Sequence, residues 1–346
     1  MIARALRYAG PNAAVRTRLG DLLRSSDYEM LLNAAELPEF LEAMRTTPYA
    51  PALQVPGKSF AFALQYHWLE RTESAAKLQP FGARDLCNAY LAKMENEAVK
   101  TVVRGIARNT ERRRLLSMLP PVPESSSIPF AAVTATDKLE DAAKVLRGTT
   151  YGDAIEEGIK VARTGDGDEL WPIEAALDRR YFIRLEAAGR RFAGVEGVVV
   201  TRLLGAVADA FNVLAAERLN RTFHLSPQAV NRQLVPWGLR VGANERRALC
   251  KWPGEGLPPI RFRRDLAEGR LRVALLRMLC REAMKPLFTV PFHAGLTFAY
   301  VLLSELEVDD LLRIYEGKQW GAERSMVAAG LIRFHGPRLS GGVSSV

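Results

Sequence analysis

The chain of 346 residues is 48% apolar and 25% charged, a composition typical of ordinary globular proteins that excludes bulk disorder, collagen and coiled-coil rods. Its 48 basic residues outnumber the 39 acidic ones, so the formal charge is +9. Because acidic residues are interleaved with the arginines throughout, we interpret the excess as solvated helix faces rather than as a basic tail. Three cysteines without a C-x-x-C pair favour a reducing compartment over a disulfide scaffold or a zinc ribbon.

The first predicted helices lie near the N-terminus. Met1 to Tyr8 contain no apolar h-region, so we expect no signal peptide. Ser26 and Glu29 have the spacing of a capping box, in which two side chains satisfy free backbone N–H groups at a helix start. Pro38 suits the first turn of the next helix, because its missing N–H is not needed there. An apolar stripe at helical spacing follows at Leu37, Phe40, Leu41 and Met44.

The same helical periodicity continues along the chain. Apolar stripes recur at Leu204, Val207, Phe211 and Leu214, and again at Tyr300, Leu303, Leu311 and Ile314. Ser226-Pro227 is another cap-and-proline start. The uncharged stretch from Pro286 to Leu303 approaches the length of a membrane span, but its prolines and His293 favour a buried helix after a turn, so we expect a soluble protein. Val198 to Val200 is the best strand candidate, and without a series of alternating strands the sequence predicts an all-α fold.

Two proline-rich breaks divide the predicted helices into three parts. Residues 120–129 and 252–259 are dense in Pro, Gly and Ser, which predicts linkers or long loops. Thr164 to Asp168 is predicted to be a turn. We therefore expect three helical units, over residues 1–125, 126–255 and 256–346.

Short motifs recur between these parts. The spacing R-x-T-x-Y occurs at Arg45, Thr47 and Tyr49 and again at Arg147, Thr149 and Tyr151. An acid followed three residues later by a polar or charged group occurs at Glu97 and Lys100, at Asp209 and Asn212, and at Glu307 and Asp310. Irregular spacing between the motifs excludes a short-period solenoid and leaves a diverged threefold repeat or chance similarity. We expect both R-x-T-x-Y sets to be structural, each fixing the turn after a helix.

The sequence contains no recognisable catalytic constellation. Gly57-Lys58-Ser59 resembles the end of a phosphate loop, but Ala52 stands where the first glycine belongs, so we predict a surface turn. Gly165-x-Gly167 lacks the third glycine of a dinucleotide fingerprint. Asn220-Arg221-Thr222 matches a glycosylation sequon, which a chain without a signal peptide would not use. Histidines and apolar-flanked cysteines are scattered at His67, His224, His293, His335, Cys87 and Cys280. We therefore predict no catalytic residue, no cofactor-binding residue and no metal ligand, and we expect a binding or mechanical protein.

Three groups of motifs, in order along nearly the whole chain, carry a family resemblance. The first group is Asp27-Tyr28-x-x-Leu31-Leu32, Phe40-Leu41 and Thr46-Thr47-Pro48-Tyr49. The second is Ala175-Ala176-Leu177-Asp178-x-x-Tyr181-Phe182, Asp209-Ala210-Phe211-Asn212-Val213-Leu214 and Leu225-Ser226-Pro227. The third is Pro291-Phe292-x-x-Gly295-Leu296, Ala299-Tyr300, Glu305-x-Glu307-Val308-x-x-Leu311 and Glu316-Gly317-Lys318. Together they resemble the C subunit of bacterial and archaeal V/A-type rotary ATPases, the counterpart of the d subunit of the eukaryotic vacuolar proton pump. Lys100 and Asp310 depart from the family pattern, which has Asn there.

The resemblance implies three related helical domains in a pseudo-threefold arrangement that forms a funnel-shaped socket. It implies no catalysis in this subunit. It implies that the socket sits on the membrane-embedded proteolipid ring and receives the foot of the central axle, the D and F subunits. Rotation would then pass between the ring and the catalytic head during proton or sodium transport. The expected location is peripheral, on the cytoplasmic face of the membrane, and positive charge would suit a rim near anionic headgroups or acidic ring loops.

An alternative from another class is an arginine-rich helical nucleic-acid-binding protein. Arg104, Arg108 and the run from Arg112 to Arg114 lie close together, and at helical spacing several would share a face. No aromatic interleaving or known reading motif accompanies them, and the family resemblance implies no nucleic-acid partner. An enzyme with an unrecognised site is a third alternative.

Overall fold

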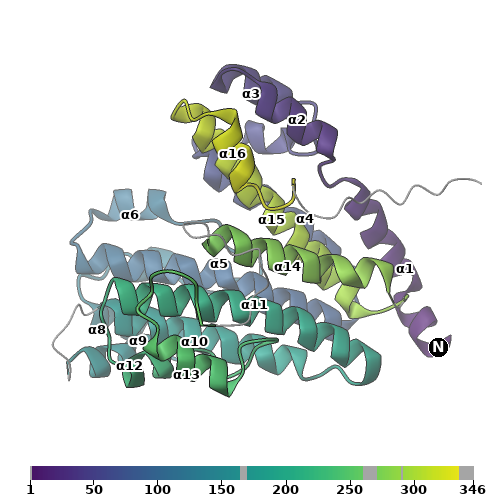
Figure 1. The fold of residues 1–346 in the computed structure, drawn as a ribbon. Helices are drawn as coiled ribbons and strands as arrows, with labels where there is room; N and C mark the ends of the chain where they lie inside the picture. Colours follow the sequence, from purple (N-terminus) through teal and green to yellow (C-terminus); the bar gives the residue numbers. More distant parts are fainter. Residues whose placement is uncertain (1, 164–169, 260–270, 290, 335–346) are drawn as a thin grey trace, which may run out of the picture.

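The computed structural model describes residues 2–163, 170–259, 271–289 and 291–334, and within these ranges the regular structure is helical, without strands (Figure 1). This confirms the predicted all-α fold. The helices are α1 (Ile2–Gly20), α2 (Ser25–Asn33), α3 (Leu37–Met44), the 3-10 helix η1 (Ala50–Gln54), α4 (Phe60–Lys77), α5 (Phe81–Ala107), α6 (Arg112–Met118), α7 (Phe130–Val133), α8 (Leu139–Val145), α9 (Thr150–Ala162), α10 (Leu170–Gly189), α11 (Gly194–Arg221), α12 (Pro227–Gln233), α13 (Ala243–Lys251), α14 (Leu271–Phe288), α15 (Ala294–Gln319) and α16 (Arg324–Gly330).

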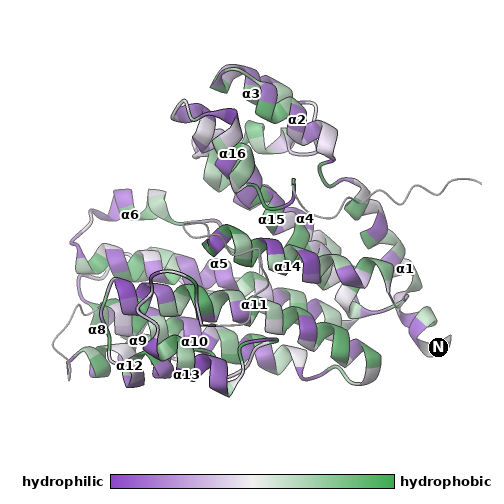
Figure 2. Cartoon of the chain, viewed as in Figure 1, coloured by the Kyte–Doolittle hydropathy of each residue, from purple (hydrophilic) through white to green (hydrophobic). Residues whose placement is uncertain are grey.

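Long helices pack in pairs, and each pair carries short helices. Helix α5 packs against α10, α11 against α14, and α15 against α4. The short helices α8 and α9 lie on the first pair, and α12 and α13 lie on α11. Green and purple segments alternate along these helices in Figure 2, as expected for helices that bury one face.

The third pair joins the two ends of the chain. Helix α3 packs on α15, and α2 packs on α16, although these helices are far apart in sequence. In Figure 1 α2, α3 and α16 gather at the top of the molecule. One hydrophobic cluster accordingly contains Leu31 and Phe40 together with Leu303 and Leu311. A second cluster is built on the C-terminal half of α5 with α8 to α10, and a third on the C-terminal half of α11 with α12 to α14.

Two of the three helix starts predicted from the sequence are confirmed. Pro38 lies in the first turn of α3, and the Ser226 hydroxyl accepts from the Ala229 N–H at 3.3 Å at the start of α12. The capping box of Ser26 and Glu29 was predicted wrongly, because α2 begins at Ser25 and the Arg24 N–H donates to the Asp27 carboxylate at 2.7 Å. A shift of one residue in the helix start changes which side chain can accept a hydrogen bond from the free N–H groups of the first turn.

Two further expectations concern apolar stretches. The strand candidate at Val198 to Val200 is not a strand, because these residues lie inside α11, where the helical stripe around Leu204 outweighs their β-branching. The stretch from Pro286 to Leu303 is, as predicted, a turn followed by a buried helix: α14 ends at Phe288, and Ala294 to Leu303 are buried in α15.

Helix α11 is the one described helix long and apolar enough to cross a membrane, with a window of mean hydropathy 1.7. Of that window, 56% is buried inside the protein. Its buried Asp209 and Asn212 bond to neighbouring backbone, so we interpret α11 as a core helix. The predicted breaks at 120–129 and 252–259 contain no helix, whereas the turn predicted at Thr164 to Asp168 lies outside the described residues.

Candidate functional site

A buried polar cluster fastens the two ends of the chain together. We call it the closure cluster; its members are Leu23, Tyr28, Tyr49, Glu307, Asp310, Ile332 and Arg333. Glu307 on α15 is fully buried, and its carboxylate accepts from the Tyr49 hydroxyl and the Leu23 N–H, both at 2.8 Å. It also pairs with the buried Arg333 guanidinium. Because buried charges are costly without partners, this carboxylate fixes three distant segments at once.

Asp310 is the second carboxylate of the closure cluster. It accepts from the backbone N–H groups of Ile332 at 2.6 Å and Arg333 at 2.7 Å, and from the Tyr28 hydroxyl at 3.1 Å. Burial raises the pKa of Asp310 to about 7, an effect that these hydrogen bonds only partly offset. The side chain therefore changes charge near neutral pH.

Stability should depend on pH through Asp310. The native state holds this proton up to about pH 7, whereas an ordinary aspartate with a pKa of 3.8 releases it. Because the native state binds more protons in that interval, the free energy of unfolding should fall as pH rises from about 4 to about 7, by up to about 1.4 kcal/mol per pH unit. Urea denaturation at several pH values measures this slope. The free energy of unfolding of Asp310→Asn should fall less steeply with pH than that of the parent chain. Identical slopes would contradict the raised pKa of Asp310.

Asp209 on α11 has the same structural role as Asp310. Its carboxylate accepts from the backbone N–H groups of Arg240 at 2.8 Å and Val241 at 2.9 Å, and burial raises its pKa to about 6. Asn212, one turn later, accepts from the Val235 N–H at 2.8 Å and donates to the Val235 carbonyl at 3.1 Å. The predicted acid motifs of α11 and α15 therefore both hold the backbone of a later segment.

The threonines of the two R-x-T-x-Y motifs make similar contacts in the structure. Thr47 and Thr149 each donate to the carbonyl of the residue three positions earlier, at 2.7 Å. Each hydroxyl also accepts from a backbone N–H, of Tyr49 or of Gly152, at 3.2 Å. These contacts confirm that both sets fix the turn after a helix. The arginines contribute less, since the pair that Arg45 forms with Glu42 is exposed to solvent.

Each tyrosine of these motifs reaches a buried carboxylate on a long helix. Tyr49 donates to Glu307 on α15, and Tyr151 donates to Glu95 on α5, both at 2.8 Å. In the acid motifs predicted from the sequence, Glu97 occupies the position equivalent to Glu307, and Glu95 was not identified. The signal that could have found it was the apolar neighbourhood of Glu95 at helical spacing, at Leu91, Ala92, Ala98 and Val99.

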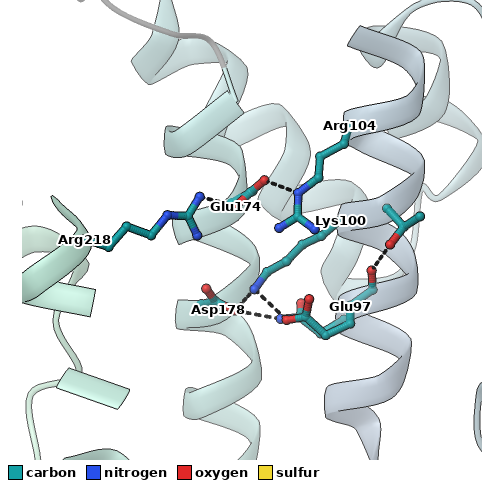
Figure 3. A network of polar contacts seen from close by, with 8 residues as sticks. Glu97, Lys100, Arg104, Glu174, Asp178 and Arg218 are labelled. Atoms are coloured by element: carbon teal, nitrogen blue, oxygen red, sulfur yellow. Dashed lines mark hydrogen bonds and ion pairs between the residues drawn. The ribbon is translucent and has the colours of Figure 1, made fainter. Parts of the chain in front are cut away.

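A second network, the central network, connects α5, α10 and α11 (Figure 3). Lys100, whose side chain is 7% exposed, lies between Glu97, at 2.9 Å, and Asp178. Although burial opposes it, the carboxylates of Asp178 and Glu97 raise the pKa of Lys100. Lys100 therefore forms an ion pair between α5 and α10, whereas Asn212 and Asp310, at the same position of their motifs, bond to backbone.

Glu174 on α10 completes the central network, and sequence reasoning missed it. Its carboxylate binds Arg104 of α5 at 2.6 Å and Arg218 of α11 at 3.2 Å. Burial acts to raise the pKa of Glu174, but the two guanidiniums outweigh burial and lower it. Beside this network lies a half-open pocket of about 340 Å³, whose wall includes Trp171, Phe211, Phe223, Gln233 and Arg218.

The described residues hold no group of three or more metal-ligating side chains. His67 lies 3.1 Å from the Pro48 carbonyl, and burial lowers its pKa. His293 directly precedes α15, His224 lies between α11 and α12, and His335 lies outside the described residues. The predicted surface turn at Gly57-Lys58-Ser59 is confirmed, because the Ser59 hydroxyl caps α4 and the Lys58 amine lies over the Phe62 ring.

The cysteines and the sequon also have structural roles. Cys87 and Cys280 are buried, and burial raises the pKa of their thiols to about 12 and about 11, which confirms buried structural thiols. Asn220 is buried and donates to the Leu249 carbonyl at 2.9 Å. Of the arginine cluster, Arg104 pairs with Glu174 and Arg112 donates to the Ala131 carbonyl at 2.8 Å, whereas Arg108, Arg113 and Arg114 are exposed.

Comparison with known proteins gives matches along most of the chain. A family model described as ATP synthase (C/AC39) subunit matches residues 11–329. The C subunit of the A-type ATP synthase of Haloferax volcanii is 24% identical over 343 residues, which cover 92% of this chain and 96% of the relative. The protein of the same name from Haloquadratum walsbyi is 25% identical over 336 residues, 89% of this chain and 93% of the relative. That from Methanothermobacter thermautotrophicus is 24% identical over 237 residues, 68% of this chain and 60% of the relative.

Proposed function

This chain belongs to the ATP synthase (C/AC39) subunit family, and we propose that it is the non-catalytic coupling subunit of a V/A-type rotary ATPase. It joins the D and F subunits of the central axle to the membrane proteolipid ring, and rotation passes through it during proton or sodium transport. It works at the cytoplasmic face of the membrane, as a peripheral part of the complex. Nucleic acid is not among its partners.

The closure cluster is the observation that best supports a mechanical role. Three of its contacts link residues 258 to 284 positions apart, so the segment from Leu23 to Tyr49 and helix α15 cannot separate without breaking buried hydrogen bonds. Each charge that crosses the membrane supplies about 2.3 kcal/mol per 100 mV, and a coupling part must pass this energy on without yielding. Close-packed helices with low compressibility, fastened by buried carboxylates, suit that task.

We propose further that the helices form three related units around a pseudo-threefold axis, as a funnel-shaped socket. The ranges 1–125, 126–255 and 256–346 describe these units in sequence. The helix pairs α4–α15, α5–α10 and α11–α14 each join helices from two different ranges, so the proposed units pack closely against one another. The matching roles of Tyr49 and Tyr151 support this repeat, and so do those of Asn212 and Asp310, which occupy the same motif position and bond to the backbone of a later segment.

Removing this protein alone should separate two activities that are normally linked. The catalytic head should still hydrolyse ATP, because its sites lie in other chains, whereas ATP-driven ion uptake by membrane vesicles should be lost. Re-addition of the purified chain should restore uptake. Full ion pumping in vesicles that lack only this protein would contradict the coupling role.

A further inference from the structure

Three helix-to-helix turns meet helix α1 at one end of the molecule, which we call the turn end. The turns connect α4 to α5, α10 to α11, and α14 to α15. In Figure 1 the ends of α11 and α14 and helix α1 lie together at the right-hand side. A Cβ added at Gly82 of α5 would lie within 4 Å of Phe192 and Arg7, so three of these segments are in close contact.

Polar contacts hold the turn end in one arrangement. Arg191, after α10, pairs with Asp85 of α5 at 2.6 Å, and the Glu196 carboxylate of α11 accepts from the Ala294 N–H at 3.0 Å. The Asn12 side chain of α1 accepts from the His293 N–H at 3.0 Å. Because these contacts join all three turns to each other or to α1, side chains on the turn end keep fixed relative positions.

Large apolar side chains project from each part of this end. Phe81 at the start of α5 is 75% exposed, Val198 in the first turns of α11 is 69% exposed, and Phe288 at the end of α14 is 65% exposed. Leu6 of α1 is 83% exposed. Single exposed apolar residues are common, but one beside each turn and another on α1, all at the same end, indicate a binding surface.

The charge of the turn end is positive. Helix α1 carries Arg4, Arg7, Arg16 and Arg18 and contains no acidic residue. Among the described residues no carboxylate pairs with Arg4 or Arg7, and Arg84 donates to the backbone carbonyls of Lys77 and Gln79. Basic residues around exposed aromatic and aliphatic side chains are the composition of surfaces that lie in the headgroup region of a bilayer.

We propose that the turn end binds directly to an anionic lipid surface. The apolar side chains of Phe81, Val198, Phe288 and Leu6 enter the boundary between headgroups and acyl chains, and the arginines of α1 lie against the lipid phosphates. Charge complementarity favours lipid over nucleic acid, since a phosphate backbone would leave the phenylalanines uncovered. This contact goes beyond the proposed coupling function, because it requires neither the ring nor the axle.

The test is flotation of the full purified chain with lipid vesicles. The chain should float with vesicles of equal parts phosphatidylglycerol and phosphatidylcholine, and much less with phosphatidylcholine alone. The double variant Phe81→Ser with Phe288→Ser should bind the anionic vesicles at least about tenfold more weakly than the parent chain, because two apolar insertions are lost. Both residues are mostly exposed, so the melting temperature should stay close to that of the parent chain.

Trp320→Ser is the matched control. Trp320 is 80% exposed but follows the far end of α15, and the 26 residues of that helix place it roughly 40 Å from the turn end. It should bind vesicles as the parent chain does. Arg4→Gln with Arg7→Gln should reduce the preference for phosphatidylglycerol, and this variant tests the proposal even if the phenylalanine variant fails to fold.

Several outcomes would overturn the proposal. One is absence of the intact chain from the floating anionic vesicles; another is equal weakening by Trp320→Ser. A third is a double phenylalanine variant that binds vesicles normally but no longer assembles on membranes that contain the ring, which would make the turn end a protein-binding surface. The first two outcomes do not depend on the coupling role, because the vesicles contain no other protein of the complex.

Discussion

Replacing Tyr49 with Ala should lower the free energy of unfolding by about 3–5 kcal/mol. The ring is 1% exposed, packs edge-on against His67 with centroids 5.5 Å apart, and donates its hydroxyl to Glu307. Truncation leaves a cavity and removes a donor from a fully buried carboxylate, and both effects act in the same direction. Urea denaturation followed by circular dichroism measures the change.

Two further variants separate the ring of Tyr49 from its hydroxyl. Tyr49→Phe keeps the packing and should cost about 1.5–3 kcal/mol, because the lost hydrogen bond had a charged acceptor. Tyr66→Ala, at a tyrosine that is 40% exposed, should cost less than about 1 kcal/mol. Unchanged stability of Tyr49→Ala together with lost partner binding would mean that Tyr49 is an interface residue instead.

Replacing Lys100 with Met should cost about 3 kcal/mol, since it leaves Asp178 without its cationic partner between α5 and α10. Glu97 loses the same partner, but it is half exposed and water can solvate it. Asp178 retains only the Asn96 amide donor at 2.9 Å among its described hydrogen bonds.

The double variant Lys100→Met with Asp178→Leu tests this explanation. Removing both charges should recover most of the lost stability, because replacing a buried pair by apolar residues is often close to neutral. Lys144→Ala is the control, since its pair with Asp141 is exposed and should be worth less than about 0.5 kcal/mol. A double variant that is as unstable as the single one would show that Lys100 stabilises by packing alone.

The sequence alone determined the helical class, two helix starts and the family. Local signals suffice for these features: Ser226-Pro227 and Pro38 act within one turn, and apolar stripes such as that from Leu204 to Leu214 reflect the helical period. The structural role of the R-x-T-x-Y motifs could also be predicted from the sequence, because both threonines bond to backbone within three residues.

The tertiary structure decided which carboxylates matter and which segments they join. The apolar neighbourhood of Glu95 indicates burial but not its partner Tyr151, 56 residues away, and nothing local connects Glu174 with Arg218, 44 residues away. Likewise, only packing shows that α2 and α3 lie against α15 and α16, since nothing in local sequence encodes a contact across more than 250 residues. Burial and long-range pairing are properties of the folded chain, because they depend on which helix faces meet and not on the helical pattern of any one segment.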